Sequence, residues 1–258
     1  MAVAPYARPL EAGNGRVGVL LCHGLTGSPA SLRPWAHHLL AAGCAVSLPL
    51  LPGHGTSWQE LNRTRWQDWY AETAAALARL SARCDDVVVA GLSMGGALAL
   101  RLAEEHPRDI AGLVLVNPAV ASSNRAFRLL PVARLVVRSR PGIGSDIKAP
   151  VVREGGYDRL PLRALHSMTQ LWKHTRADLA KVTAPILLLR SVEDHVVDPS
   201  SARVIVAGVS SRDVEEVLLH DSYHVATLDH DAPRIMAAAD EFLRRVTDAR
   251  VPGVPRAG

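Results

Sequence analysis

The chain of 258 residues lacks the features that mark several large protein classes. Its three cysteines form no C-x-x-C pair, and each sits in or beside an apolar run, so buried free thiols are expected and a zinc or redox site is not. No apolar run approaches the roughly 18 residues that a membrane span needs. The N-terminal segment lacks the charged start and apolar stretch of a signal peptide. We therefore expect a cytoplasmic protein without a stable membrane anchor.

Positive charge is present but is not concentrated. The net charge is +4, the only lysines are Lys148, Lys173 and Lys181, and the arginines are scattered along the chain. A nucleic-acid surface needs clustered basic residues, so we expect no nucleic-acid partner. The glycine-rich turn after the first apolar run lacks the G-x-G-x-x-G pattern, which disfavours a nicotinamide cofactor. We expect neither a metal nor an organic cofactor.

Short apolar segments alternate with amphipathic segments along most of the chain. At 48% hydrophobic residues, the chain has enough apolar side chains for a full core. The apolar segments predict strands over 16–22, 44–50, 86–92, 112–120, 185–191 and 214–220. Helical spacing predicts helices over 31–42, 66–82, 94–105, 200–209 and 231–247. This alternation predicts an α/β fold with a mostly parallel sheet that helices cover on both faces.

One interval, from 121 to 176, breaks the alternation. No strand is evident in it, prolines and glycines punctuate it, and about 55 residues are too many for a plain connection. We interpret it as a helical cap insertion over one end of the sheet. The chain then divides into an α/β core of residues 1–120 and 177–250, a cap of residues 121–176 and a flexible tail of residues 251–258. The apolar stretch RLLPVARLVV (128–137) has the density to line an acyl-chain tunnel, although packing of a cap helix on the sheet explains it equally.

The segment VVVAGLSMGGALAL (87–100) carries the clearest chemical signal. Ser93 stands between a predicted strand and a predicted helix, in a G-x-S-x-G pattern with Gly91 and Gly95. In so tight a turn, side chains at the two glycine positions would collide with the neighbouring strand and helix. Parallel sheets bind ligands at the carboxyl ends of their strands, where this serine lies. The pattern predicts a nucleophilic serine held in a strained backbone conformation.

A nucleophilic serine needs a histidine base, and the base needs an orienting carboxylate. In a fold of this type the order along the chain is serine, acid, histidine. The candidates for the acid are Glu193, Asp194 and Asp198. The candidates for the base are His220, His224 and His230. We favour Asp194, whose short side chain directly precedes a turn, and His224, which lies in mid-loop where its side chain is free to reach Ser93.

A tetrahedral intermediate needs two donors for its oxyanion. One is expected to be the backbone N–H of Met94, which follows the serine. The other is expected from the turn HGLTG (23–27), with Leu25 as the donor.

Six motifs carry a resemblance to a known family: HGLTGSPASLRPWA, LPGHGTSWQELNRTRWQDW, GLSMGG, GIGSDIK, SVEDHVVDP and SYHVATLDHD. In these motifs, which span almost the whole chain, it resembles an α/β-hydrolase of the bacterial monoacylglycerol lipase and carboxylesterase branch. The resemblance implies Ser93 as nucleophile, Asp194 as acid and His224 as base, with Leu25 and Met94 at the oxyanion hole. Phenylalanine often follows His-Gly in this family; because only the backbone N–H is needed, Leu25 changes the pocket wall and not the catalysis.

The resemblance also implies that the cap carries the pocket for the acyl chain and the alcohol. Ile143 and Glu154 are the candidate substrate-binding residues there, and Glu154 is expected to accept hydrogen bonds from glycerol hydroxyls. We therefore expect a serine esterase of lipid metabolism that cleaves monoacylglycerols and short- or medium-chain monoesters through an acyl-enzyme on Ser93. The alternatives are a thioesterase, a carbon–carbon hydrolase, a perhydrolase, or a non-catalytic hydrolase-fold protein that binds a ligand.

Overall fold

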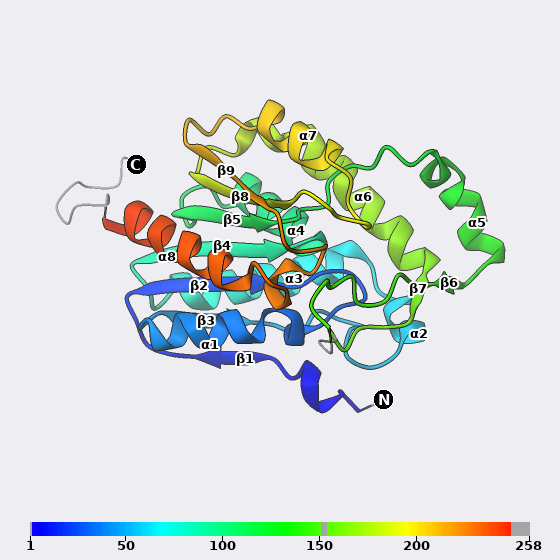
Figure 1. The fold of residues 1–258 in the computed structure, drawn as a ribbon, viewed down its shortest axis with the longest axis horizontal. Coiled ribbons are helices and arrows are strands. Elements are labelled where there is room, and N and C mark those ends of the chain that lie inside the picture. Colours follow the sequence, from blue (N-terminus) through cyan, green and yellow to red (C-terminus); the bar gives the residue numbers. More distant parts are fainter. Residues whose placement is uncertain (1, 151–153, 249–258) are drawn as a thin grey trace.

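A seven-stranded sheet forms the centre of the molecule (Figure 1). The computed structural model describes residues 2–150 and 154–248. The sheet has the order β1-β3-β2-β4-β5-β8-β9, in which β1 is antiparallel to β3 and all other neighbours are parallel. Its strands are β1 (Leu10–Ala12), β2 (Val17–Cys22), β3 (Ala45–Leu48), β4 (Asp86–Leu92), β5 (Gly112–Val116), β8 (Ile186–Ser191) and β9 (Val214–Leu219). The predicted α/β architecture with a mostly parallel sheet is confirmed.

Helices cover both faces of this sheet (Figure 1). One face packs against α1 (Arg33–Ala41) and α8 (Ala232–Asp248), and the other packs against α3 (Trp66–Ser81), α4 (Met94–Glu105), α6 (Leu162–Asp178) and α7 (Ser200–Gly208). Successive side chains of a strand point to opposite faces. Val19 and Leu21 of β2 therefore join the core under α1 and α8, while Leu20 and Cys22 join the core on the other face. Because both faces are covered, these strands appear in the sequence as unbroken apolar runs.

Several short elements escape the sequence prediction. The edge strand β1 has only three residues, and α2 (Trp58–Leu61) is a single turn that begins where the Ser57 hydroxyl accepts the N–H of Glu60. The expectation that residues 121–176 hold no strand is wrong, because β6 (Ser139–Pro141) pairs with β7 (Arg159–Pro161). Each of these two strands has three residues and ends in proline, so neither shows a periodic pattern. The 3₁₀ turns are Pro5–Ala7, Pro29–Leu32, Arg125–Leu129, Leu179–Lys181 and Ala226–Leu228.

The segment between β5 and β8 lies at one end of the sheet, with α5 (Leu130–Val136) and the β6–β7 pair on the right of Figure 1. Its helix α6 runs on to Asp178, and the tail that we expect at 251–258 lies outside the described residues. No helix in the described part of the chain has both the length and the apolar character needed to cross a bilayer.

Of the two interpretations of residues 128–137, the lining of an acyl-chain tunnel is wrong. Four apolar side chains of this segment point to solvent: Leu129, Val132, Leu135 and Val136 are 67–81% exposed. Helix α5 packs against α6 through Leu130 and Ala133, and none of the ten residues lines the cavity described below. The apolar spacing of the segment therefore marks the outer surface of the molecule.

Candidate active site

Ser93 forms the turn between β4 and α4. Its φ of 57° and ψ of −118° place a non-glycine residue in a strained backbone region. The neighbouring glycines are required by space: a Cβ on Gly91 would lie 2.2 Å from the carbonyl oxygen of Gly95, and a Cβ on Gly95 would lie 1.9 Å from that of Cys22. The structure thus contains the tight strand-to-helix turn that the sequence predicts.

Ser93 lines a cavity of about 400 Å³. The polar side chains that line it include Asp146, Glu154, Asp194, His195 and His224. The apolar side chains include Phe127, Ile143, Leu160, Leu165, Met168, Trp172 and Val197. The structure therefore brings the favoured candidates (Ser93, Asp194, His224, Ile143 and Glu154) to one cavity.

The ring of His224 is bonded to the carboxylate of Asp194. The distance from Nδ1 of His224 to Oδ2 of Asp194 is 2.8 Å, and both side chains are less than a tenth exposed. A carboxylate accepts, so Nδ1 carries the proton and Nε2 is the basic nitrogen. The second oxygen of Asp194 accepts the backbone N–H groups of Val196 and Val197, each at 2.8 Å. These bonds hold the carboxylate in the orientation that the imidazole requires.

Of the other candidates for acid and base, only Asp198 lines the cavity, and it is bonded to the insertion rather than to His224. Glu193 is 59% exposed and does not line the cavity. Asp198 accepts hydrogen bonds from the backbone and the hydroxyl of Ser123, and so anchors the first residues of the insertion. His220 and His230 are exposed and line no part of the cavity.

Among the cavity groups whose pKa values are shifted, His224 and Glu154 matter most for the chemistry. Burial lowers the pKa of His224, but the hydrogen bond to Asp194 and the negative charges of Asp194, Glu154 and Asp146 outweigh it, so the pKa lies above its ordinary value. Burial raises the pKa of Glu154 to about 7, against the opposing effect of His224. His224 and Glu154 therefore both change charge at pH values above their ordinary ones.

The turn that carries Leu25 approaches Ser93 closely. A Cβ on Gly24 would lie 3.3 Å from Cβ of Ser93, and Leu25 itself lines the cavity. Thr26 has a φ of 64°, and its hydroxyl donates to the carbonyl oxygen of Leu25 at 2.6 Å. Met94 is the first residue of α4, where a backbone N–H has no acceptor within the helix. The two expected oxyanion donors thus flank Ser93.

The buried side chain of His23 holds this turn in place through hydrogen bonds to the backbone. Burial lowers the pKa of its imidazole to about 4, so the ring is neutral near pH 7. Its Nε2 accepts the N–H of Leu51 at 3.2 Å, and its Nδ1 donates to the carbonyl oxygen of Gly24 at 3.0 Å. From the insertion, the N–H of Tyr157 donates to the carbonyl oxygen of Thr26 at 3.0 Å. The bonds of His23 and the bond of Tyr157 together position the backbone of the turn beside Ser93.

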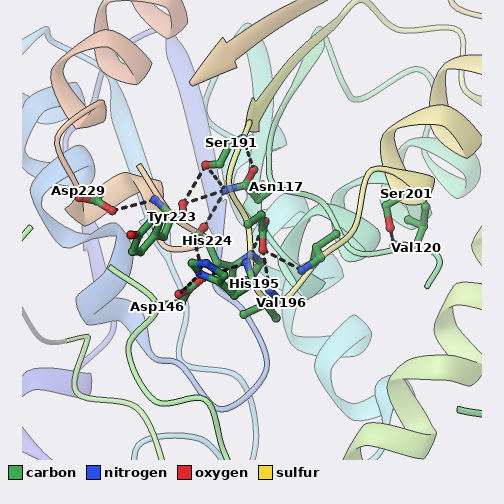
Figure 2. A network of polar contacts seen from close by, with 12 residues as sticks. Asn117, Val120, Asp146, Ser191, His195, Val196, Ser201, Tyr223, His224 and Asp229 are labelled. Atoms are coloured by element: carbon green, nitrogen blue, oxygen red, sulfur yellow. Dashed lines mark hydrogen bonds and ion pairs between the residues drawn. The ribbon is translucent and has the colours of Figure 1, made fainter. Parts of the chain in front are cut away.

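The sequence reasoning missed Asn117, whose side chain is bonded to the backbone of His224 (Figure 2). Its amide nitrogen donates to the carbonyl oxygen of His224 at 2.8 Å and to the hydroxyl of Ser191 at 3.0 Å. Its amide oxygen accepts the N–H of Ser191 at 2.7 Å. Asn117 has a φ of 43°, a conformation that asparagine tolerates. An asparagine directly after an apolar strand was the available signal.

The described residues contain no group of three or more His, Cys, Asp or Glu side chains arranged to hold a metal ion. The cysteines are free: Cys22 is buried, and Cys44 and Cys84 are partly buried. Burial raises the pKa of the Cys22 thiol to about 12, so it stays protonated and behaves as an apolar side chain.

Comparison with known proteins identifies the family. The model of the alpha/beta hydrolase family matches residues 19–258. The chain belongs to the alpha/beta hydrolase family. A thermostable monoacylglycerol lipase from Bacillus sp. (strain H-257) is 44% identical to this hydrolase over 244 residues, which cover 93% of the chain and 95% of that lipase. A carboxylesterase from Bacillus subtilis (strain 168) is 25% identical, with 93% of the chain and 97% of the esterase covered.

Solved structures agree with this assignment. A structure reported for the metagenome-derived lipolytic enzymes LipS and LipT superimposes on the hydrolase with a TM-score of 0.91 at 38% identity, covering 95% of this chain and 100% of that chain. The monoacylglycerol lipase from Paleococcus ferrophilus has a TM-score of 0.78 at 19% identity, over 95% and 100% of the two chains, and shows the fold alone. The predicted resemblance to bacterial monoacylglycerol lipases and carboxylesterases is confirmed.

Proposed function

We propose that this alpha/beta hydrolase cleaves carboxylic esters, above all monoacylglycerols and short- or medium-chain monoesters, through an acyl-enzyme on Ser93. The observation that carries the proposal is the 2.8 Å hydrogen bond between His224 and Asp194, beside a cavity that Ser93 also lines. The names of the related monoacylglycerol lipase and carboxylesterase point to the same class of substrate.

In the proposed acylation step, the hydroxyl oxygen of Ser93 attacks the carbonyl carbon of the ester while Nε2 of His224 takes its proton. The carbonyl oxygen becomes an oxyanion, which the backbone N–H groups of Leu25 and Met94 stabilise. The bond to the alcohol oxygen then breaks, and His224 gives its proton to the leaving alcohol. Asp194 keeps Nδ1 protonated and stabilises the imidazolium that forms in between.

Deacylation repeats these steps with water in place of the serine hydroxyl. His224 takes a proton from the water, which attacks the acyl carbon. When the second tetrahedral intermediate collapses, Ser93 leaves with the proton and the fatty acid is released. No metal or organic cofactor enters this sequence of steps.

The composition of the cavity supports an amphiphilic substrate. The side chains of Leu165, Met168 and Trp172 on α6 give one part of its wall an apolar surface suited to a single acyl chain. In another part the carboxyl group of Glu154 lies against Gly27, where an added Cβ would be 2.4 Å from Oε1. We assign this part to the alcohol, with Glu154 bonded to glycerol hydroxyls and Ile143 on the pocket wall.

We expect Glu154→Ala to lower kcat/KM for monocaprylin by about 10- to 100-fold, because the variant leaves the glycerol hydroxyls without their partly buried partner. Methyl caprylate has the same acyl chain but no glycerol, and its hydrolysis should change by less than about threefold. Both are measured on the pH plateau above the acid limb of each protein, where the imidazole of His224 is neutral with or without the charge of Glu154.

Glu193→Ala is the matched control, since this glutamate is exposed and lies outside the cavity. In this control, kcat/KM should be unchanged for both monocaprylin and methyl caprylate. An equal loss on monocaprylin and methyl caprylate in Glu154→Ala would mean that Glu154 acts on the triad and not on the alcohol.

The substrate class itself is tested with mono-, di- and tricaprylin. A cavity of about 400 Å³ is at the lower end of the range for small-molecule sites, and it accommodates one caprylyl chain and glycerol. Monocaprylin should therefore be hydrolysed at least about tenfold faster than tricaprylin at equal ester concentration. Comparable rates on tricaprylin would contradict a pocket closed by a narrow cap and would indicate an open lipase site.

A further inference from the structure

The carboxylate of Asp146 lies between the loops that carry the proposed acid and base (Figure 2). It belongs to the insertion, between β6 and β7, and is 8% exposed. Its Oδ1 accepts a hydrogen bond from ring Nδ1 of His195 at 2.8 Å. Its Oδ2 accepts two backbone N–H groups, that of His195 at 3.3 Å and that of His224 at 3.2 Å.

These contacts link the loop of Asp194 to the loop of His224, whose side chains must stay within hydrogen-bond distance of each other. His195 directly follows Asp194, and His224 carries the base, so one carboxylate is bonded to the backbone on both sides of the Asp194–His224 pair. The first loop follows β8 and the second follows β9. A change in the separation of the loops therefore changes the 2.8 Å bond on which the imidazole depends.

The core supplies the opposite support. Asn117, at the end of β5, holds the carbonyl oxygen of His224, while Asp146 holds its N–H from the insertion. The carbonyl oxygen of Asp146 also accepts the N–H of Val225 at 3.0 Å. The backbone of the base is thus held between the core and the insertion.

The segment that carries Asp146 is itself bonded to the histidine loop. Asp229 accepts the backbone N–H groups of Lys148 at 2.7 Å and Ala149 at 2.9 Å, and Nζ of Lys148 pairs with Asp221 at 2.9 Å. The residues that follow Asp146 in the insertion are therefore bonded to the loop that carries His224, and these bonds fix the position of Asp146.

We propose that Asp146 is a positioning residue: it holds the loops of Asp194 and His224 at the separation that the triad needs, and so makes catalysis depend on correct placement of the insertion. This inference rests on the proposed function. Misplacing a reacting group by about 1 Å can cost about 100-fold in rate. Because Asp146 acts on the alignment of the base and not on the ester, its loss should lower kcat and leave KM nearly unchanged.

The test measures kcat and KM for p-nitrophenyl butyrate in Asp146→Asn and Asp146→Ala. Asparagine has the same shape, but its NH2 group faces either the ring Nδ1 of His195 or both backbone N–H groups. We expect kcat to fall by about 10- to 100-fold in both variants, with KM within about twofold of the wild type. Glu193→Gln removes a charge near His195 without touching either loop backbone, and it should behave as the wild type.

A double-mutant cycle with Asp194→Asn separates positioning from a general structural effect. If Asp146 acts through the Asp194–His224 pair, adding Asp146→Asn to Asp194→Asn should lower kcat by less than about threefold. Two full, multiplicative losses would overturn the proposal, as would a variant with wild-type kcat. A raised KM with unchanged kcat would also overturn it and assign Asp146 to substrate binding.

The pH profile supplies an independent readout. The charged groups that face His224 are Asp194, Glu154 and Asp146, and each raises its pKa. Asp146→Asn should therefore move the acid limb of kcat/KM to lower pH, because the lost charge and a weakened bond to Asp194 both lower the pKa of His224. If neither Asp146 variant folds, Asp229→Asn, which releases the same segment, takes their place and should show the same loss in kcat.

The activities of Ser93→Ala and Asp146→Asn distinguish a wrong role for Asp146 from a wrong function for the protein. If Ser93→Ala retained esterase activity, the function itself would be wrong. If Ser93→Ala is inactive and Asp146→Asn is fully active, the function stands and only the role of Asp146 is lost.

Discussion

Ser93→Ala should lower kcat for p-nitrophenyl butyrate by about 10⁴-fold or more while the protein still folds. In the proposed mechanism the hydroxyl supplies the atom that forms the acyl-enzyme, and no other side chain of this strand-to-helix turn replaces it. Alanine fits the turn, because the backbone bonds of residue 93 to Val116, Gly96 and Ala119 do not involve the side chain. The rate is measured together with the thermal unfolding midpoint, which should be close to that of the wild type.

Residual activity after this substitution comes only from binding and the oxyanion donors. A variant that keeps more than a few per cent of the wild-type rate would rule out Ser93 as the nucleophile. Because Ser93 and His224 act as one unit, Ser93→Ala/His224→Ala should be no less active than either single variant.

His224→Ala should be about as inactive as Ser93→Ala, whereas His220→Ala and His230→Ala should keep most of the wild-type rate. The imidazole of His224 is bonded to Asp194 and lines the cavity, while the other two histidines are exposed. The three alanine variants are compared by kcat at saturating p-nitrophenyl butyrate. An active His224→Ala beside an inactive His220→Ala would transfer the role of base to His220.

The pH dependence follows from the protonation state of the same ring. Only neutral His224 accepts the proton of the serine, so kcat/KM should rise with pH as the imidazole loses its proton. Its pKa is raised above the ordinary value of 6.5, and the midpoint of the rise should therefore lie above pH 6.5. Glu154→Gln removes one of the charges that raise the pKa, so the midpoint should move to lower pH. A profile without an acid limb would contradict this assignment.

The sequence predicts the core of the fold well because local patterns and burial agree there. The helix expected at 66–82 is α3, and the apolar runs at 86–92 and 185–191 become β4 and β8, buried on both faces. The elbow at Ser93 is equally local: its glycines are required by contacts within the turn and with Cys22 on the adjacent strand.

The contacts that support the triad escape prediction because they join distant parts of the chain. Asp146 meets His224 across 78 positions and His195 across 49 positions. Asn117 meets His224 across 107 positions. Local sequence patterns do not predict contacts between residues so far apart in the chain. The motif GIGSDIK therefore indicated the family but not what Asp146 contacts.

The segment 128–137 shows where a correct pattern leads to the wrong environment. Its apolar residues at 129, 132, 135 and 136 follow helical spacing, which is typical of a buried face. In the structure this stripe points to solvent, because the short helix α5 already packs through Leu130 and Ala133 on its other side. Helical spacing of apolar residues predicts an apolar face on a helix, but it does not predict whether that face packs on the core or faces solvent.

Labelling with a fluorophosphonate tests the central claim most directly. The reagent loses fluoride and forms a phosphonyl ester on a serine that a base activates, and mass spectrometry of the digested protein locates it. We predict one adduct per chain, on the peptide that contains Ser93, with no adduct in Ser93→Ala and a strongly slowed reaction in His224→Ala. An adduct on a different serine, or hydrolysis that continues in the fully labelled protein, would contradict the assignment of Ser93 as the nucleophile.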